Sequence, residues 1–351
     1  MSARRVPFER VWVPIDAVRH GVLRATVDLL GELGRRLIAD RELRVAMTAT
    51  FAIALALALT TWIPMWMLAL GPIVLGVPHV VGDVRYLIVR RGYHRRLWLV
   101  ALCVLPLVAA WWESQVTWVL VACTAAMLAS RASPARRFVG VLGLAALVAV
   151  SAHFGYWSDV AFAHLHNVVG VLLWLLWAPR RGVIWLVPVL AYVGVWAFVM
   201  LGGLDFMAAR ESLDVAWPGL SFGTHAWTLA PTLAEPWALR LVLIFAFAQS
   251  IHYWVWLRLV PEEDRGRPTP RSFRASWRAL YRDMGPWVLG LATVAAVVVA
   301  GWACIDVANA RAGYLRMAIF HGQIELVALT LFLAEGRPGR WSRSAEARLE
   351  R

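Results

Sequence analysis

Long apolar runs separated by short arginine-rich segments make up most of this chain. A membrane-spanning helix needs about 20 predominantly apolar residues, and by that measure the chain has about ten candidate spans. The predicted spans cover residues 46–62, 63–89, 97–112, 116–130, 138–155, 158–178, 182–203, 237–258, 286–306 and 311–334. The pattern therefore predicts an all-α fold, a polytopic transmembrane helical bundle.

The same pattern divides the chain into three regions. In residues 1–45, apolar positions recur at helical spacing between arginines, which predicts a cytoplasmic, interfacial amphipathic helical segment. Residues 46–334 form the transmembrane helical domain, and residues 335–351 form a basic cytoplasmic tail. One long connection, over 204–236, is either an ordered surface loop or a lid over a cavity.

The arginines predict the orientation of the spans. They are concentrated in segments such as 90–96, 131–137 and 258–283, whereas 111–115 and 306–313 carry few. Cytoplasmic loops of membrane proteins carry an excess of basic residues, so this alternation places both termini in the cytoplasm. The clustering also explains a formal net charge of +13 without a nucleic-acid partner, and we expect none.

Composition agrees with a membrane protein and argues against a soluble globular domain. The chain is 60% hydrophobic and only 16% charged, and its 21 Trp residues suit the two membrane interfaces. We expect an integral membrane protein of the bacterial cytoplasmic (inner) membrane, with the lipid bilayer as its surroundings. The three cysteines show no metal-binding or redox spacing.

The histidines are the candidate functional residues. Three of the nine fall outside the spans, where we expect them to be solvated: His20, His94 and His225. A helical rise of about 1.5 Å per residue places most of the others within about 12 Å of depth around the bilayer centre, with His153 at the outer end of its span. The six candidate metal ligands are His79, His153, His164, His166, His252 and His321.

Several of these histidines have a polar neighbour on the same helix face, because residues three or four apart lie one above the other. We expect these neighbours to orient the imidazoles from outside the ligand shell. His166 is two residues from His164 and therefore points about 200° away around the helix. The predicted pairs are His79 with Asp83, His321 with Glu325, His252 with Gln249, and His164 with Asn167.

Ionisable groups at membrane depth are costly and commonly mark a functional site. Neutral imidazole is the commonest metal ligand, and several imidazoles with nearby carboxylates suit a transition metal such as non-haem iron, copper or zinc. Haem is an alternative, since two facing histidines can serve as axial ligands. A single histidine at membrane depth more often makes an interhelical hydrogen bond than binds a metal, so the metal site rests on several of them lying at similar depth.

Residues 76–83, GVPHVVGD, resemble the GxPHGxxD signature of the Brp/Blh family, the membrane enzymes that cleave β-carotene to retinal. Val80 stands where that signature has its second glycine. Gly76 and Pro78 in this stretch also predict a broken or kinked helix. Residues 151–159, SAHFGYWSD, resemble the family's HFGxxD segment, with Asp159 one position late. The family's later pair of histidines is reduced to His252 here.

The resemblance implies a multi-helical membrane fold and a non-haem iron held by His79, His153 and His252. Three functions remain open. The first is a metal-dependent, oxygenase-like oxidoreductase acting on a hydrophobic or lipid substrate. The second is a proton-coupled transporter, and the third a non-catalytic haem-binding or scaffold subunit. The first predicts that His79, His252, His321 and one of His164 or His166 converge.

Overall fold

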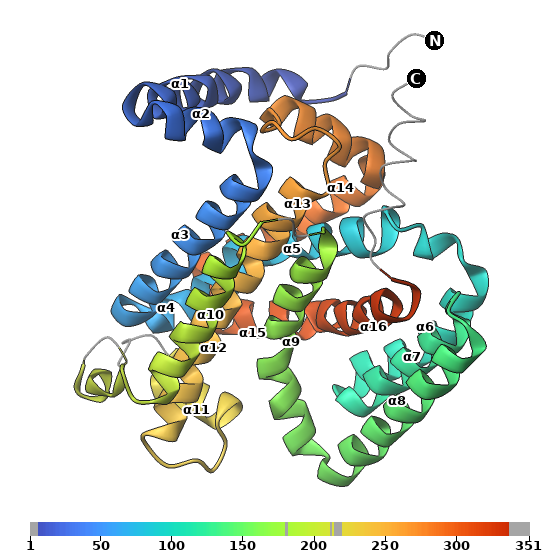
Figure 1. Cartoon of the computed structure of the whole chain (residues 1–351). Coiled ribbons are helices and arrows are strands. Elements are labelled where there is room, and N and C mark those ends of the chain that lie inside the picture. The colour runs from blue at the N-terminus through green and yellow to red at the C-terminus, as the bar shows by residue number, and fades with distance from the viewer. Residues whose placement is uncertain (1–5, 180–181, 211–212, 214–219, 337–351) are drawn as a thin grey trace.

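The computed structural model describes residues 6–179, 182–210, 213 and 220–336. Within these ranges every regular element is a helix (Figure 1). Seven helical stretches are long and apolar enough to cross a membrane: Arg41–Trp62, Pro64–Val89, Pro134–Phe154, Tyr156–Trp177, Trp237–Glu263, Phe273–Ile305 and Val307–Glu335. Three further apolar helices are shorter: Leu97–Glu113, Val116–Ala129 and Leu186–Met200.

The ten predicted spans thus correspond to ten apolar helical stretches, of which seven meet the length expected for a membrane crossing. The predicted basic tail lies outside the described residues apart from its first two positions. Of the long 204–236 connection, Asp205–Ala209 and one helix are described, whereas 211–212 and 214–219 are not. The helices are α1 (Trp12–Leu30), α2 (Glu32–Ala39), α3 (Arg41–Trp62), α4 (Pro64–Leu70), α5 (Gly76–Asp83), α6 (Leu97–Glu113), α7 (Val116–Ala129), α8 (Pro134–Phe154), α9 (Tyr156–Trp177), α10 (Leu186–Met200), α11 (Phe222–Leu229), α12 (Trp237–Trp254), α13 (Val260–Glu263), α14 (Phe273–Ile305), α15 (Val307–Ala318) and α16 (Phe320–Glu335).

Helix α12 is the centre of the packing. It contacts α3, α9 and α10, and large side chains on it and just after it, such as Phe247 and Trp256, are fully buried. An apolar helix surrounded by other helices is apolar on all sides, as α12 is. Because of this position, Gln249 and His252 of α12 lie in the interior of the protein.

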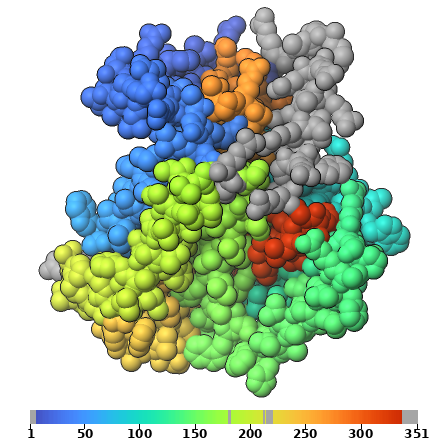
Figure 2. All heavy atoms as spheres, in the orientation of Figure 1, coloured from blue at the N-terminus to red at the C-terminus, as the bar shows by residue number. Residues whose placement is uncertain are grey.

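The α1–α2 hairpin lies beside the start of α14, at one end of the molecule (Figures 1 and 2). The carboxylate of Asp16 accepts hydrogen bonds from the backbone N–H groups of Phe273 and Arg274, at 2.6 and 3.1 Å, and so caps α14. On the outer side of the hairpin, Val18 and Leu29 are 68% and 83% exposed. Exposed apolar side chains beside a basic face are typical of a helix at a membrane interface.

Ion pairs hold several arginine-rich segments together. Arg90 lies 2.9 Å from Asp264, and Arg96 lies 2.8 Å from Glu335 at the end of α16. The segments around 90–96 and 264–271 and the end of α16 therefore share one side of the molecule. These are segments that the charge pattern assigns to the same side of the membrane.

Candidate metal centre

The helix that carries His79 contains two wide turns. α5 lies between the π-helical turns Gly71–Leu75 and Val84–Val89, and the whole stretch continues from Pro64 to Val89. A proline ring crowds the carbonyl of the residue four positions earlier, and a π turn widens the helix at that point. The predicted break at Gly76 and Pro78 is therefore a continuous helix with widened turns. Such turns are frequent at functional sites.

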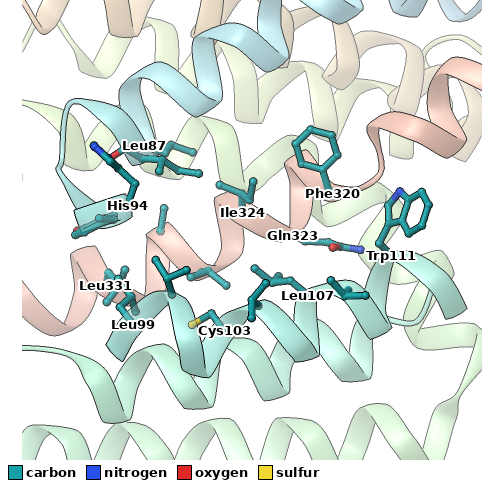
Figure 3. A pocket seen from close by; sticks show the side chains of 17 residues that line it. Leu87, His94, Leu99, Cys103, Leu107, Trp111, Phe320, Gln323, Ile324 and Leu331 are labelled. Carbon is teal, nitrogen blue, oxygen red and sulfur yellow. The ribbon is translucent and has the colours of Figure 1, made fainter. Parts of the chain in front are cut away.

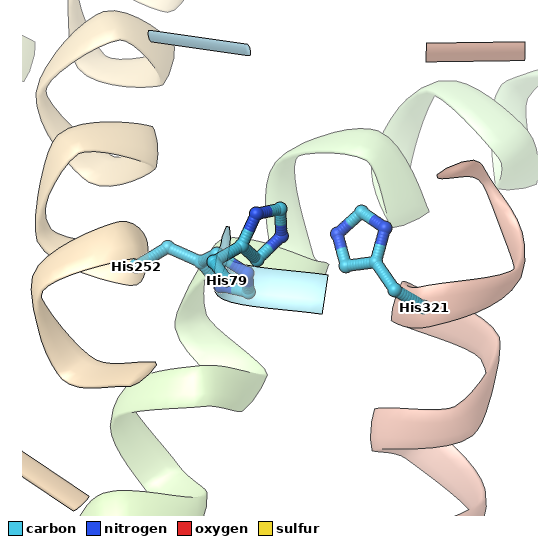
Figure 4. A group of neighbouring side chains, drawn as sticks. All are labelled: His79, His252 and His321. Carbon is cyan, nitrogen blue, oxygen red and sulfur yellow. The ribbon is translucent and has the colours of Figure 1, made fainter. Parts of the chain in front are cut away.

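Three histidines from different helices converge on one point. His79 of α5, His252 of α12 and His321 of α16 each offer a ring nitrogen, and these nitrogens all lie within 4.8 Å of one another (Figure 4). The ring centroids of His79 and His321 are 4.7 Å apart. Ligands about 2 Å from a shared ion lie within about 4 Å of one another, so small ring movements would suffice to enclose one.

His166 of α9 is the fourth member of the group. Its ring centroid lies 5.3 Å from that of His252 and 5.8 Å from that of His321. It packs against α16 at Gly322, where a Cβ would lie 3.6 Å from the His166 side chain, an ordinary van der Waals contact. Four helices, α5, α9, α12 and α16, thus contribute one imidazole each.

Backbone contacts set the tautomer of three of the four rings. In each, Nδ1 lies near a carbonyl oxygen three or four residues earlier in the chain. A carbonyl oxygen can only accept, so Nδ1 carries the proton and Nε2 keeps its lone pair. This is the usual state of a metal-binding imidazole. The contacts join His79 to Leu75 at 3.3 Å, His166 to Ala163 at 2.7 Å and His321 to Ala318 at 2.5 Å.

The His321 contact lies where α15 ends and α16 begins. α15 finishes at Ala318 and α16 starts at Phe320, so the last carbonyl groups of α15 lose their helical partners. The His321 ring donates to the carbonyl of Ala318. The break between the two helices therefore holds this imidazole in place.

Two fully buried carboxylates adjoin the histidines. Asp83 Oδ2 lies 3.9 Å from His79 Nε2, and Glu325 Oε1 lies 3.4 Å from His252 Nε2. Glu325 therefore faces a histidine on another helix instead of His321, its predicted partner four residues away. None of the four carboxylate oxygens has a hydrogen bond of good geometry among the described residues.

The other two predicted outer residues also have different neighbours from those expected. Gln249 Nε2 donates to Tyr253 Oη at 2.7 Å, and the Tyr253 ring packs against His79 with centroids 4.7 Å apart. Gln249 thus acts on His79 through Tyr253, and not directly on His252. Asn167 is fully buried, and both polar atoms of its amide lack a partner in the described part of the chain.

The remaining two candidate ligands lie apart from the group. His164 donates its Nε2 proton to the carbonyl of Leu229, at 2.8 Å, because the adjacent turn of α9 points it toward α11. His153 is exposed near the end of α8 and packs on Phe154. The structure therefore brings His79, His166, His252 and His321 together and leaves these two outside.

Two features are not evident from the sequence, one at the group and one in α11. At Gly170, a Cβ would lie 2.8 Å from His252 Nδ1, so only glycine leaves room for this ring. His225, expected to be solvated, is 1% exposed, and its Nδ1 lies 3.0 Å from the carbonyl of Ser221. No periodic signal identifies either one, because both depend on a neighbouring helix.

Several of the buried polar atoms without a hydrogen bond in the described part of the chain lie at this centre. They include His79 Nε2, both ring nitrogens of His252, and all the side-chain oxygens of Asp83 and Glu325. A buried polar group without a partner costs about 1–3 kcal/mol, and more when it is charged. Neutral imidazoles beside carboxylates form a set of donor atoms that suits a transition-metal cation.

An apolar pocket of about 550 Å³ lies beside α16 (Figure 3). Phe320, Gln323 and Ile324 line it from α16, and Leu107 and Trp111 line it from α6. His321 does not line the pocket, although it neighbours Phe320 in the chain. The pocket has the volume and character of a site for a small apolar molecule.

Comparison of the chain with protein-family models, with curated proteins and with solved structures gives no significant match.

Proposed function

We propose that His79, His166, His252 and His321 bind a transition metal, with non-haem iron as the first candidate, in a membrane oxidoreductase that acts on a hydrophobic or lipid substrate. The observation that carries the proposal is the convergence of three ring nitrogens within 4.8 Å. The protein would act in the bacterial cytoplasmic membrane.

The donor set fits a metal ion. Three of the rings present Nε2, since their Nδ1 protons are held by backbone carbonyls. Neither ring nitrogen of His252 has a hydrogen bond among the described residues, and Glu325 adjoins its Nε2. A carboxylate at that place compensates the charge of a cation and orients the imidazole. When bound, an iron ion held by imidazoles and open to a further ligand supplies the activation of dioxygen.

The apolar pocket beside α16 is the candidate entry for the substrate. Its wall on α6 includes Val104 and Val108. Their side chains are 45% and 54% exposed and would face the acyl chains of the bilayer. An apolar molecule dissolved in the bilayer would reach this pocket without crossing water. Phe320 and Gln323 line the pocket and lie on either side of His321 in the chain.

The likeness to the Brp/Blh signature supports the proposal at one motif only. His79 and Asp83 of the GxPHxxxD stretch belong to the buried group. His153, from the HFG stretch, is exposed and lies outside it. Carotenoid cleavage is accordingly one member of a wider class of oxygenase reactions that the site would suit.

Haem fits this group of residues less well than a single ion. The four imidazole rings contact one another edge to face, with centroid distances such as 4.7 Å between His79 and His321. A porphyrin between two axial histidines would need a flat slot, and the neighbouring rings fill that space.

Elemental analysis of the purified protein tests the proposal. We expect a stoichiometric transition metal in the wild type and in the His153→Ala variant, and its loss in a His79→Ala, His321→Ala double variant. Folding of each variant is checked by circular dichroism and size exclusion in detergent. A folded wild-type protein that binds no metal, even after incubation with Fe²⁺, would reject the proposal in favour of a proton carrier or a scaffold.

A further inference from the structure

A second, larger cavity of about 1060 Å³ lies between α1, α5, α14 and the π-helical turn Val255–Leu259. Ligand pockets commonly measure about 300–1,000 Å³, so this cavity can hold a sizeable molecule. One part of its wall is apolar. The apolar side chains include Ile73, Val77, Val81, Leu289, Ala292 and Ala296.

The other part of the wall is strongly basic. A single carboxylate, that of Glu262, lines the cavity among six arginines. The arginines are Arg19, Arg44, Arg85, Arg258, Arg265 and Arg271. They come from the side of the molecule that holds the other arginine-rich segments.

The carboxylates nearby do not balance this charge. Glu262 is shared by three guanidinium groups: Arg44 at 2.7 Å, Arg258 at 2.8 Å and Arg265 in direct contact. Asp283, which does not line the cavity, pairs with Arg85 at 2.8 Å. Two acidic groups therefore pair with four arginines. A third, Asp16, accepts hydrogen bonds from the backbone N–H groups of Phe273 and Arg274, and two more arginines remain.

Those two are Arg19 and Arg271. Arg19 donates to the carbonyl of Pro270 at 2.8 Å, and Arg271 has no ion pair or hydrogen bond within the described ranges. Burial, together with the neighbouring cations Arg258 and Arg44, lowers the pKa of Arg265 to about 9. The basic end of the cavity thus carries uncompensated positive charge.

We propose that this cavity binds one anionic phospholipid, with its phosphate on Arg19 and Arg271 and an acyl chain along the apolar wall between α5 and α14. A basic mouth joined to an apolar slot matches the two ends of such a lipid. Arginine is well suited to phosphate because its planar fork donates two parallel hydrogen bonds. Basic pockets between transmembrane helices are known sites for anionic headgroups.

This lipid site is separate from the candidate metal centre. Pro78 and Val81 of α5 line the cavity, whereas His79, between them in the chain, does not. The proposal therefore does not depend on a metal, and either one can fail without the other.

Native mass spectrometry of the delipidated full-length protein, titrated with phosphatidylglycerol, tests the proposal. We expect one lipid to bind to the wild type, and at least ten-fold weaker binding to an Arg19→Gln, Arg271→Gln variant. The matched control is Arg24→Gln, which changes an exposed arginine of the same α1 helix outside the cavity. Equal binding to the double variant and to this control would overturn the proposal.

The apolar wall is tested by Ala292→Trp, which fills the slot, against Val294→Trp, which lies two residues away on an exposed face of α14. Only Ala292→Trp should prevent the lipid from binding. Phosphatidylcholine binding as tightly as phosphatidylglycerol would show that the arginines do not select the headgroup. Displacement of the lipid by millimolar inorganic phosphate would show an anion site that needs no acyl chain. Either result contradicts the proposal.

Discussion

The Nε2 atom of His252 on α12 lies 3.4 Å from Oε1 of Glu325 on α16, with both side chains fully buried. This pair joins the most buried helix of the bundle to the last one. It also places a carboxylate beside the one histidine of the group whose nitrogens both lack a hydrogen bond. The centre therefore depends on how α9, which contacts both helices, places α12 relative to α16, as well as on the residues that each carries.

If Glu325 orients His252, replacing it with glutamine should weaken metal binding. We expect Glu325→Gln to reduce the affinity about 10- to 100-fold, the usual effect of losing an outer partner of a ligand. The measurement is competition with a chelator of known affinity. The control, Glu335→Gln, alters a glutamate at the end of the same helix that pairs with Arg96. An equal effect of the two changes would count against the orienting role.

The fourth imidazole is tested by comparing two histidines of α9. His166→Ala should weaken metal binding by more than about 10-fold, because it removes a ligand and not only the partner of a ligand. His164→Ala should leave binding unchanged, since His164 is held by Leu229 of α11. A metal centre unaffected by His166→Ala would have only three imidazole ligands.

Glycine at position 170 leaves room for the His252 ring. In the interior of a helix, glycine to alanine normally stabilises by about 0.5–1 kcal/mol. At Gly170 the new Cβ would lie 2.8 Å from His252 Nδ1, so we expect Gly170→Ala to destabilise the protein by about 1–3 kcal/mol and to weaken metal binding. Gly143→Ala, with no atom within 4 Å of its Cβ, is the control. The measurement is thermal unfolding in detergent. A gain of stability in both variants would disprove the steric role of Gly170.

Glu262 neutralises three arginines in a buried place. It is 3% exposed and contacts Arg44, Arg258 and Arg265. Removing one partner of a buried ion pair costs about 3–5 kcal/mol, so Glu262→Gln should lower the unfolding free energy by about that amount. Glu32→Gln, which alters an exposed glutamate on α2, should leave stability unchanged. Chemical denaturation in detergent compares the two, and a similar midpoint for both would contradict the expectation.

His225 predicts a pH dependence of stability outside the spans. Burial, with the positive charge of Arg311 as a second cause, lowers the pKa of His225 to about 4 from its ordinary 6.5. Below pH 6.5 the unfolded chain takes up a proton that the folded protein does not. Stability is therefore fully present above that pH, and we expect it to fall as the pH drops toward 4.

The test compares thermal unfolding between pH 7 and pH 4 in the wild type and in His225→Gln. The wild type should lose more stability over this range than the variant. His94→Gln, at an exposed histidine, should behave as the wild type does. The same slope in the wild type and in His225→Gln would refute the role of His225.

The sequence predicts which helices carry the centre but not all of the contacts within it. The depth of each histidine follows from its count along an apolar run, and on that basis His79, His252 and His321 were expected at similar depth. Partners were inferred only within one helix, because spacing of three or four residues is all that a sequence shows directly. Helical spacing accordingly pairs Glu325 with His321, whereas in the structure Glu325 lies beside His252 of another helix.

The same limit explains the other differences. Whether His164 or His166 faces the centre depends on the rotation of α9, which the spacing of the two residues leaves open. His225 lies in a connection whose folding against neighbouring helices leaves it 1% exposed, and sequence polarity gives no sign of this. The π turns around α5 have no reliable periodic signal, since each differs from an α-helical turn by a single residue.

Those π turns give the helix that carries His79 an unusual tolerance of a deletion. A π turn holds one residue more than an α turn and takes up that residue within the turn. Deleting a single residue from Gly71–Leu75 would restore an ordinary α turn and leave His79 facing His252 and His321, whereas a deletion in the α-helical turn just before His79 would rotate its ring by about 100°. The direction in which this imidazole points thus depends on where in the helix a residue is lost as much as on the number lost.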